Sequence, residues 1–207
     1  MTPLFFESIP VTLPRPAIYR RLGYRKESTR ISPGQRQEVE GYIADAVAML
    51  QLKGSSLRLP IEVEGSALIS LPEGNAFVSR KLARFLKDAR EIILMGATAG
   101  TTIMEAIQAD IGGRNVTRGV VLDATASEVV DAGLDWIMGY FRQSLRREGK
   151  TLLNSRFSSG YGDFALENQR LIHRLLQMDS FNVTITESCL LVPEKSVTAV
   201  TGIITSV

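Results

Sequence analysis

Residues 156–163 bring a cation, hydroxyls, glycines, an aromatic ring and a carboxylate together in one short stretch, Arg156-Phe157-Ser158-Ser159-Gly160-Tyr161-Gly162-Asp163. Arg156 offers a planar guanidinium that suits a carboxylate or a phosphate, and Tyr161 offers a stacking face with a polar tip. The glycines let the backbone approach a flat ligand or adopt positive φ, and Asp163 can cap a helix that follows. A tight loop before a helix is the simpler interpretation, because Gly-rich turns are common there.

The composition is that of an ordinary globular chain and excludes several classes of function. The 207 residues are 44% hydrophobic and 22% charged, with a net charge of +2, so we expect one main core and no strong attraction to nucleic acid. No segment reaches the roughly 18 consecutive apolar residues of a membrane span. The first residues also lack the basic start and long apolar run of a signal peptide. We therefore expect a cytoplasmic protein that does not bind membranes.

One cysteine and one histidine are too few for a zinc site built by the protein alone. Cys189 is followed by three apolar residues, which favours a small buried side chain rather than a disulfide partner or metal ligand. His173 is expected beside the apolar stripe of a helix, as a structural residue.

Residues 1–31 are predicted to form a basic N-terminal arm. Prolines at positions 3, 10, 14 and 16 interrupt regular structure, and a short helix from Ala17 to Leu22 is expected to end at Gly23. Glu27 is the single acid among the cations of this stretch, which are Arg15, Arg20, Arg21, Arg25, Lys26 and Arg30. We expect a solvated arm, with contact to an acidic partner or a phosphate tail as the alternative.

Residues 32–207 are predicted to form a single domain. Ser32 and Gln35 can form a capping box around Pro33, which predicts a helix to about residue 52. The remaining patterns predict two strands in 57–71 joined at 64–66, a helix capped by Ser79, a buried strand at 91–96, helices at 102–111, 119–147 and 164–177, and two strands in 181–205 joined near 193–195. This mixed order favours an α+β class with a mainly antiparallel mixed sheet packed with several helices.

Two further stretches have the residue types of a binding site. A strand, a loop of small residues and a helix follow one another around Ala97-Thr98-Ala99-Gly100, and this arrangement is similar to a phosphate cradle. It lacks the glycine pattern and lysine of known nucleotide loops, so close strand–helix packing is favoured. Asp131 and Asp135 lie one helical turn apart and can hold a cationic amine or form part of a solvated face.

The order of three motifs resembles the activation (reactivation) domain of cobalamin-dependent methionine synthase. The motifs are Arg156-x-Ser158-x-Gly160-Tyr161, then Thr186-Glu187-Ser188, then Pro193-x-x-Ser196-Val197. Weaker matches upstream are Leu122-Asp123-Ala124 and Ala97-Thr98-Ala99-Gly100. The resemblance covers most of the chain and implies the fold of that domain. It also implies binding of S-adenosylmethionine (AdoMet), presented to a cobalamin that a partner protein carries.

The resemblance assigns AdoMet contacts to particular residues. Arg156 takes the position of the arginine that binds the ligand carboxylate, and Asp131 that of the acid that binds its ammonium group. Ser158 and the backbone of Gly160 and Tyr161 match the loop that holds the adenine, with Tyr161 facing ligand or corrin. Glu187 either lines the same cleft or orders its own loop.

The sequence also departs from the family pattern. Gly162-Asp163-Phe164-Ala165 replaces a Pro-Ala-Cys-Pro sequence, Val192 stands before Pro193 where aromatic residues are usual, and Thr201 takes the place of a tyrosine that helps to hold AdoMet.

Three hypotheses follow. The first is a reactivation component that binds AdoMet. It would act in trans, as an accessory subunit, on a cobalamin-dependent methionine synthase or related corrinoid protein. Flavodoxin or a ferredoxin-type donor would supply the electron that allows methyl transfer to cobalt. The second is a non-catalytic corrinoid-protein interaction module that has lost AdoMet binding, which Thr201 favours. An ordinary AdoMet-dependent methyltransferase is the weakest, because no Gly-rich loop follows the first strand.

Overall fold

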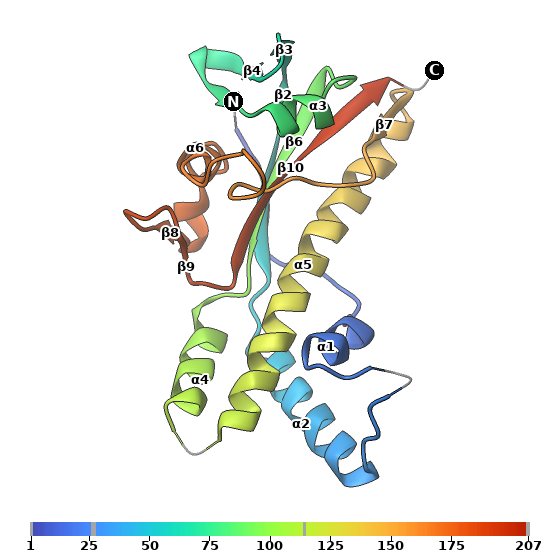
Figure 1. The fold of residues 1–207 in the computed structure, drawn as a ribbon, viewed down its shortest axis with the longest axis vertical. Helices are drawn as coiled ribbons and strands as arrows, with labels where there is room; N and C mark the ends of the chain where they lie inside the picture. Colours follow the sequence, from blue (N-terminus) through green and yellow to red (C-terminus); the bar gives the residue numbers. More distant parts are fainter. Residues whose placement is uncertain (1, 26–27, 114, 206–207) are drawn as a thin grey trace.

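A curled antiparallel sheet of five strands organises the molecule. The computed structural model describes residues 2–25, 28–113 and 115–205. In spatial order the strands of this sheet are β1 (Leu4–Phe6), β2 (Lys53–Pro60), β6 (Glu91–Thr98), β10 (Ser196–Thr205) and β7 (Lys150–Leu152), and every pairing is antiparallel. Together with the helices around it (Figure 1), this sheet confirms the predicted α+β class.

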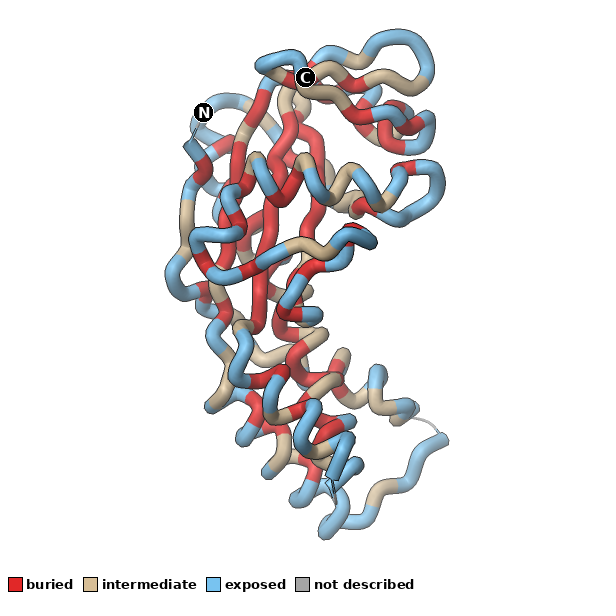
Figure 2. Tube along the Cα trace, turned by 90° about the vertical axis from the view of Figure 1, so that its left-hand side faces the viewer, coloured by how far each residue is buried: buried red, intermediate tan, exposed pale blue. Residues whose placement is uncertain are grey.

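The central strand β6 was predicted from its continuous apolar run, and its side chains alternate between two cores. Ile93 and Met95 pack in one core with the long helix α5 (Val116–Arg146). Ile92 and Leu94 pack in a second core on the opposite face of the sheet. Because both faces are covered, β6 is buried along nearly its whole length, and the strands at the centre of the sheet are mostly red in Figure 2.

Helices extend beyond one end of the sheet. α1 (Arg15–Arg21), α2 (Pro33–Met49) and α4 (Thr101–Ile111) lie around the first half of α5 (Figure 1). The buried residues of α4 join the core that α5 shares with the sheet, whereas α1, α2 and α5 form a third core. The third core is small and consists of Ile18, Val39, Ile43, Val121 and Ala124. The predicted capping box of α2 is confirmed by two reciprocal hydrogen bonds. The Ser32 side chain accepts one from the backbone N–H of Gln35, and the Gln35 side chain accepts one from the backbone N–H of Ser32.

The described part of the N-terminal stretch packs on the rest of the domain instead of standing apart as an arm, although its described cations are exposed to solvent as expected. β1 pairs with β2, and Ile18 on α1 is completely buried against α2 and α5. The physical reason is that apolar residues alternate with the cations, and their burial fixes the backbone. Lys26 and Glu27 lie outside the described residues.

Two small sheets lie beside the main one. β3 (Glu62–Glu64), β4 (Leu68–Ser70) and β5 (Ala76–Val78) form an antiparallel meander, which confirms the predicted turn at 64–66. β8 (Thr184–Ile185) and β9 (Leu191–Val192) form a short hairpin. The helices and 3₁₀ turns on this side are η1 (Pro72–Gly74), α3 (Arg80–Phe85), α6 (Asn168–Leu175) and η2 (Met178–Phe181). The helix predicted at 164–177 is shorter in the structure, where α6 covers Asn168–Leu175. The stretch between the helices predicted at 119–147 and 164–177, for which no strand was predicted, contains β7.

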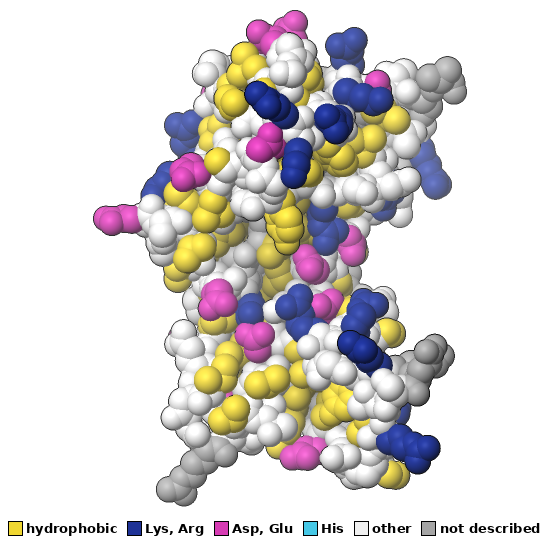
Figure 3. Space-filling model, viewed as in Figure 1, with side chains coloured by type: hydrophobic (Ala, Val, Ile, Leu, Met, Phe, Trp, Pro, Cys, Tyr) yellow, Lys and Arg dark blue, Asp and Glu magenta, His cyan; other side chains and the backbone are white. Residues whose placement is uncertain are grey.

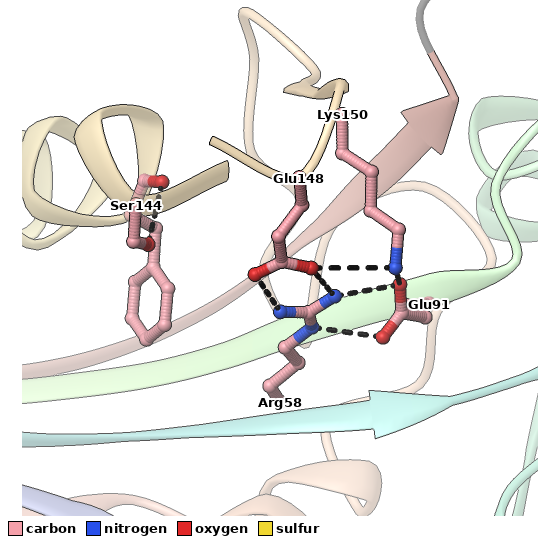
Figure 4. Close-up of polar contacts among 6 residues, drawn as sticks. Arg58, Glu91, Ser144, Glu148 and Lys150 are labelled. Carbon is pink, nitrogen blue, oxygen red and sulfur yellow. Dashed lines mark hydrogen bonds and ion pairs between the residues drawn. The ribbon is translucent and has the colours of Figure 1, made fainter. Parts of the chain in front are cut away.

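Four charged side chains tie the end of α5 to the sheet (Figure 4). Arg58 on β2 donates to Glu91 on β6 at 2.8 Å and to Glu148, just after α5, at 2.7 Å. Lys150 on β7 donates to Glu91 at 2.5 Å. Hydrogen bonds from Arg58 lower the pKa of Glu148 to about 2 and also lower the pKa of Glu91. All four groups are thus held in their charged forms.

Within the described residues, no helix is long and apolar enough to cross a membrane.

Candidate functional site

An open pocket of about 370 Å³ lies between α5 and the segment that follows β7. Its lining residues are Asp131, Arg156, Phe157, Ser158 and Tyr161. Four of these were predicted from the sequence as ligand-binding residues, and the fifth, Phe157, adds an apolar wall. The fold therefore brings the Arg-Ser-Tyr motif against the helix acid that the resemblance paired with it.

The segment that lines the pocket is anchored to the central sheet. Phe157 and Val200 on β10 exchange two backbone hydrogen bonds of 2.8 Å. Next to this bridge, the hydroxyl of Thr201 donates to the carbonyl oxygen of Ser155 at 2.8 Å. Thr201 is completely buried, so this side chain fixes the entry to the loop rather than lining the pocket.

Arg156 forms ion pairs with both aspartates of α5. Its guanidinium donates to the Asp131 carboxylate at 3.3 Å, to the Asp131 carbonyl at 3.5 Å, and to the carboxylate of Asp135. The guanidinium side chain is 24% exposed, whereas those of Asp131 and Asp135 are 49% and 68% exposed. Of the two alternatives for the acidic pair, a bound cation or a solvated helix face, both apply in part: the aspartates are exposed and the cation beside them is Arg156. The sequence spacing identified Asp135 but did not indicate this partner.

Two glycines shape the loop around Tyr161. Gly160 and Gly162 have φ of +87° and +63°, which favour glycine. A Cβ at Gly162 would lie 2.6 Å from the Cδ atom of Lys81, so the loop and α3 touch here. Tyr161 is 68% exposed and stands at the edge of the pocket. A loop of this form presents an aromatic face to whatever occupies or covers the pocket.

The prediction that Asp163 caps the helix after it is wrong. Its carboxylate accepts hydrogen bonds from the Ser79 hydroxyl at 2.6 Å and from the backbone N–H groups of Arg80 and Lys81 at 2.9 and 3.1 Å. These bonds, led by the one from Ser79, lower the pKa of Asp163. Asp163 thus caps α3 from a distance in sequence, because the loop folds back over the start of that helix.

Glu187 does not line the pocket. It lies in the turn between β8 and β9 with its side chain exposed, and its carbonyl oxygen accepts a hydrogen bond from Arg170 at 2.5 Å. In the same turn, the Thr186 hydroxyl accepts from the Leu190 backbone at 3.0 Å and contacts the Ser188 hydroxyl at 3.0 Å. These bonds order the turn, and a role for Glu187 toward a ligand remains a prediction.

Cys189 and His173 are both buried. The His173 Nε2 atom lies 2.7 Å from the Val183 carbonyl oxygen, which is a structural contact on α6. Among residues 2–25, 28–113 and 115–205, no group of three or more His, Cys, Asp or Glu side chains is placed to hold a metal ion.

Comparison with solved structures identifies the fold. A crystal structure of the MetH reactivation domain bound to AdoHcy matches the chain with a TM-score of 0.71 over 98% of this chain and 78% of that one. The chain has the methionine synthase reactivation-domain fold. The sequence identity is only 16%, so the likeness shows the fold and not the activity. No protein-family model and no curated protein sequence matches the chain.

Proposed function

We propose that the chain binds AdoMet in the pocket between α5 and the 156–163 loop and serves as a reactivation component for a corrinoid protein. The observation that carries this proposal is the arrangement of opposite charges in the pocket. A guanidinium and a carboxylate lie 3.3 Å apart there, and this pair is complementary to the carboxylate and ammonium groups of an amino acid.

The pocket residues fit AdoMet in charge and in size. Arg156 would bind the ligand carboxylate and Asp131 its ammonium group. Ser158, the Gly160 backbone and the Tyr161 ring would hold the adenosine part. The volume of about 370 Å³ falls in the range of small-molecule pockets, about 300–1,000 Å³. AdoMet, when bound, would supply the methyl group, and the protein's task is to position it.

Because Arg156 pairs with two aspartates in the free protein, ligand binding would exchange these pairs rather than bury an unpaired charge. An isolated buried charge is costly, whereas exchanging one partner for another keeps each charge compensated. The Arg156 guanidinium keeps its fork geometry in both states, which favours a planar carboxylate.

The partner in this proposal is a cobalamin-binding methionine synthase or related corrinoid protein in the cytoplasm. The exposed ring of Tyr161 would face the corrin that the partner carries. A flavodoxin or ferredoxin-type protein would supply the electron. The chain would thus act in trans as an accessory subunit.

The alternative is an interaction module that has lost AdoMet binding, and the placement of Thr201 favours it. Thr201 is buried and bonded to Ser155, so it supplies none of the contacts expected of a tyrosine at that position. Under this alternative, the exposed loop would bind a corrinoid protein without a small ligand.

The test is a reactivation assay in trans. A cobalamin-loaded methionine synthase that lacks its own reactivation domain would be inactivated by oxidation, then mixed with this chain, AdoMet and a reducing system. We expect recovered homocysteine methylation with the wild-type chain and with Arg20→Ala, which removes a cation from α1. Arg156→Ala should recover little. Recovery that does not need AdoMet, or that Arg156→Ala supports fully, would refute the proposal.

A further inference from the structure

A second pocket lies between the turn of the β3–β4 hairpin and α3. Its volume is about 440 Å³, and its lining residues are Val63, Gly65, Ser66, Arg80, Ala83, Arg84 and Lys87. Lys and Arg side chains gather over this part of the surface (Figure 3). The polar side chains of the lining are three cations and one hydroxyl, so nearly every polar group facing the pocket is a hydrogen-bond donor.

The fold directs these cations to one place. Arg80 and Arg84 lie one turn apart on the same face of α3, and Lys87 lies in the turn that follows the helix. The opposite face of α3 is fixed in the core by Leu82 and Leu86. The first backbone N–H groups of α3 are already bonded to Asp163 and Ser79, so the free donors of this pocket are its side chains.

Few carboxylates compensate this positive charge. Among the residues that the structure describes, no ion pair joins Arg80 or Arg84 to an acid, and Lys87 reaches only Asp88, at 3.8 Å. Glu62 and Glu64 flank Val63 on β3, but alternation along the strand directs them to the opposite face. The chain as a whole carries a net charge of only +2. The two arginines, which have no ion pair among the described residues, and Lys87, whose single ion pair is long and exposed, therefore form a local excess of positive charge that favours an anionic ligand.

We propose that this pocket binds a phosphate-bearing small molecule with at least two negative charges. The two guanidinium groups present planar forks suited to phosphate oxygens, with Lys87 and the Ser66 hydroxyl as further donors. The apolar floor formed by Val63 and Ala83 would contact the rest of the molecule. This pocket is separate from the one lined by Arg156 and Tyr161, because the two share no lining residue.

Nuclear magnetic resonance titration of the full chain with sodium pyrophosphate, at constant ionic strength, tests the proposal. We expect saturable shifts of the backbone amide signals of Gly65, Ser66 and Arg84. Arg84→Gln should weaken binding about tenfold, which is near the lower end of the effect of losing one charge-assisted hydrogen bond, because Arg84 is exposed. Arg20→Gln makes the same change of charge on α1 and should leave the affinity unchanged. Thermal unfolding would verify that both variants fold.

Three results would overturn the proposal. The first is the absence of saturation by about 10 mM pyrophosphate, which would mean an affinity too weak for a built site. The second is equal weakening by both substitutions, since that would indicate unspecific attraction. The third is tighter binding of an oligoglutamate peptide than of pyrophosphate, which would assign the surface to an acidic protein segment instead.

Discussion

Exchanging each aspartate beside Arg156 for asparagine should change AdoMet affinity in opposite directions. Asp131 lines the pocket and would bind the ligand ammonium group, whereas Asp135 pairs with Arg156 but does not line the pocket. Asp135→Asn therefore removes a carboxylate that competes with the ligand carboxylate for Arg156. Asp131→Asn removes a group that the ligand needs. Both substitutions keep the side-chain shape, so charge is the main change.

The exposure of the side chains determines how large the two changes in AdoMet affinity should be. Asp135 is 68% exposed and Arg156 is 24% exposed, so their ion pair is worth about 0–1 kcal/mol. Asp135→Asn should thus tighten binding by up to about fivefold. Asp131→Asn loses a charge-assisted hydrogen bond of about 1.5–3 kcal/mol. The loss is partly offset because Arg156 is released, which leaves a weakening of about twofold to a hundredfold.

Calorimetric titration of both variants and the wild type with AdoMet measures the two effects. A repeat at high salt should reduce the difference between wild type and Asp135→Asn, because exposed charges are screened. If both substitutions weaken binding, Asp135 acts as a ligand-binding group or as a structural support for Arg156. If neither has an effect, the ligand does not place its amino-acid end against α5.

Two further predictions concern the sheet. Ser55 and Ser56 are adjacent, buried residues of β2, but only the Ser55 hydroxyl has a partner, the Leu176 carbonyl at 2.8 Å. Ser55→Ala should therefore destabilise the fold by about 1–3 kcal/mol, lowering Tm by roughly 2–4 °C per kcal/mol, while Ser56→Ala should be neutral or stabilising. Arg58 lowers the pKa of Glu148 to about 2, whereas the pKa of an ordinary glutamate is about 4.3. The ion pair of Glu148 therefore stabilises the fold fully at pH values above about 4.3, and this stabilisation is lost as the pH falls toward 2. Glu148→Gln should flatten the decline in stability across this pH range.

Each of these predictions has an internal control. The two serine variants control each other, because the same atom is deleted at neighbouring buried positions. Equal Tm values for Ser55→Ala and Ser56→Ala would contradict the inferred hydrogen bond. For the acid range, Glu105→Gln changes an exposed glutamate on α4 and should leave the pH profile as in the wild type. A Glu148→Gln profile identical to that of the wild type would show that the charge network adds nothing to stability.

Local signals predicted the elements that form from local interactions. The capping box at Ser32 and the continuous apolar run of β6 each depend on residues that are close together in the sequence, and both are confirmed. The edge strands β1 and β7 have three residues each and form only by pairing with distant strands. Such short strands leave little periodicity in the sequence, which explains why no strand was predicted at β7.

The pocket was only partly predictable, because some of its contacts join residues that are distant in the sequence. The motif around Arg156 and Tyr161 indicated a ligand loop, and the helix spacing indicated Asp131 and Asp135. The cap formed by Asp163 was missed because Ser79, its partner, lies 84 residues earlier in the chain. Glu187 was assigned by its motif, yet the structure places it in the β8–β9 turn, where its backbone is bonded to Arg170.

Calorimetric titration of the wild-type chain and Arg156→Ala with AdoMet tests the central claim most directly. We predict binding in the micromolar range, about −8 kcal/mol, for the wild type and for the control Arg20→Ala, and none for a folded Arg156→Ala. A folded wild-type protein that shows no binding would contradict the AdoMet site and support the interaction module. Equal binding by Arg156→Ala would place the ligand elsewhere.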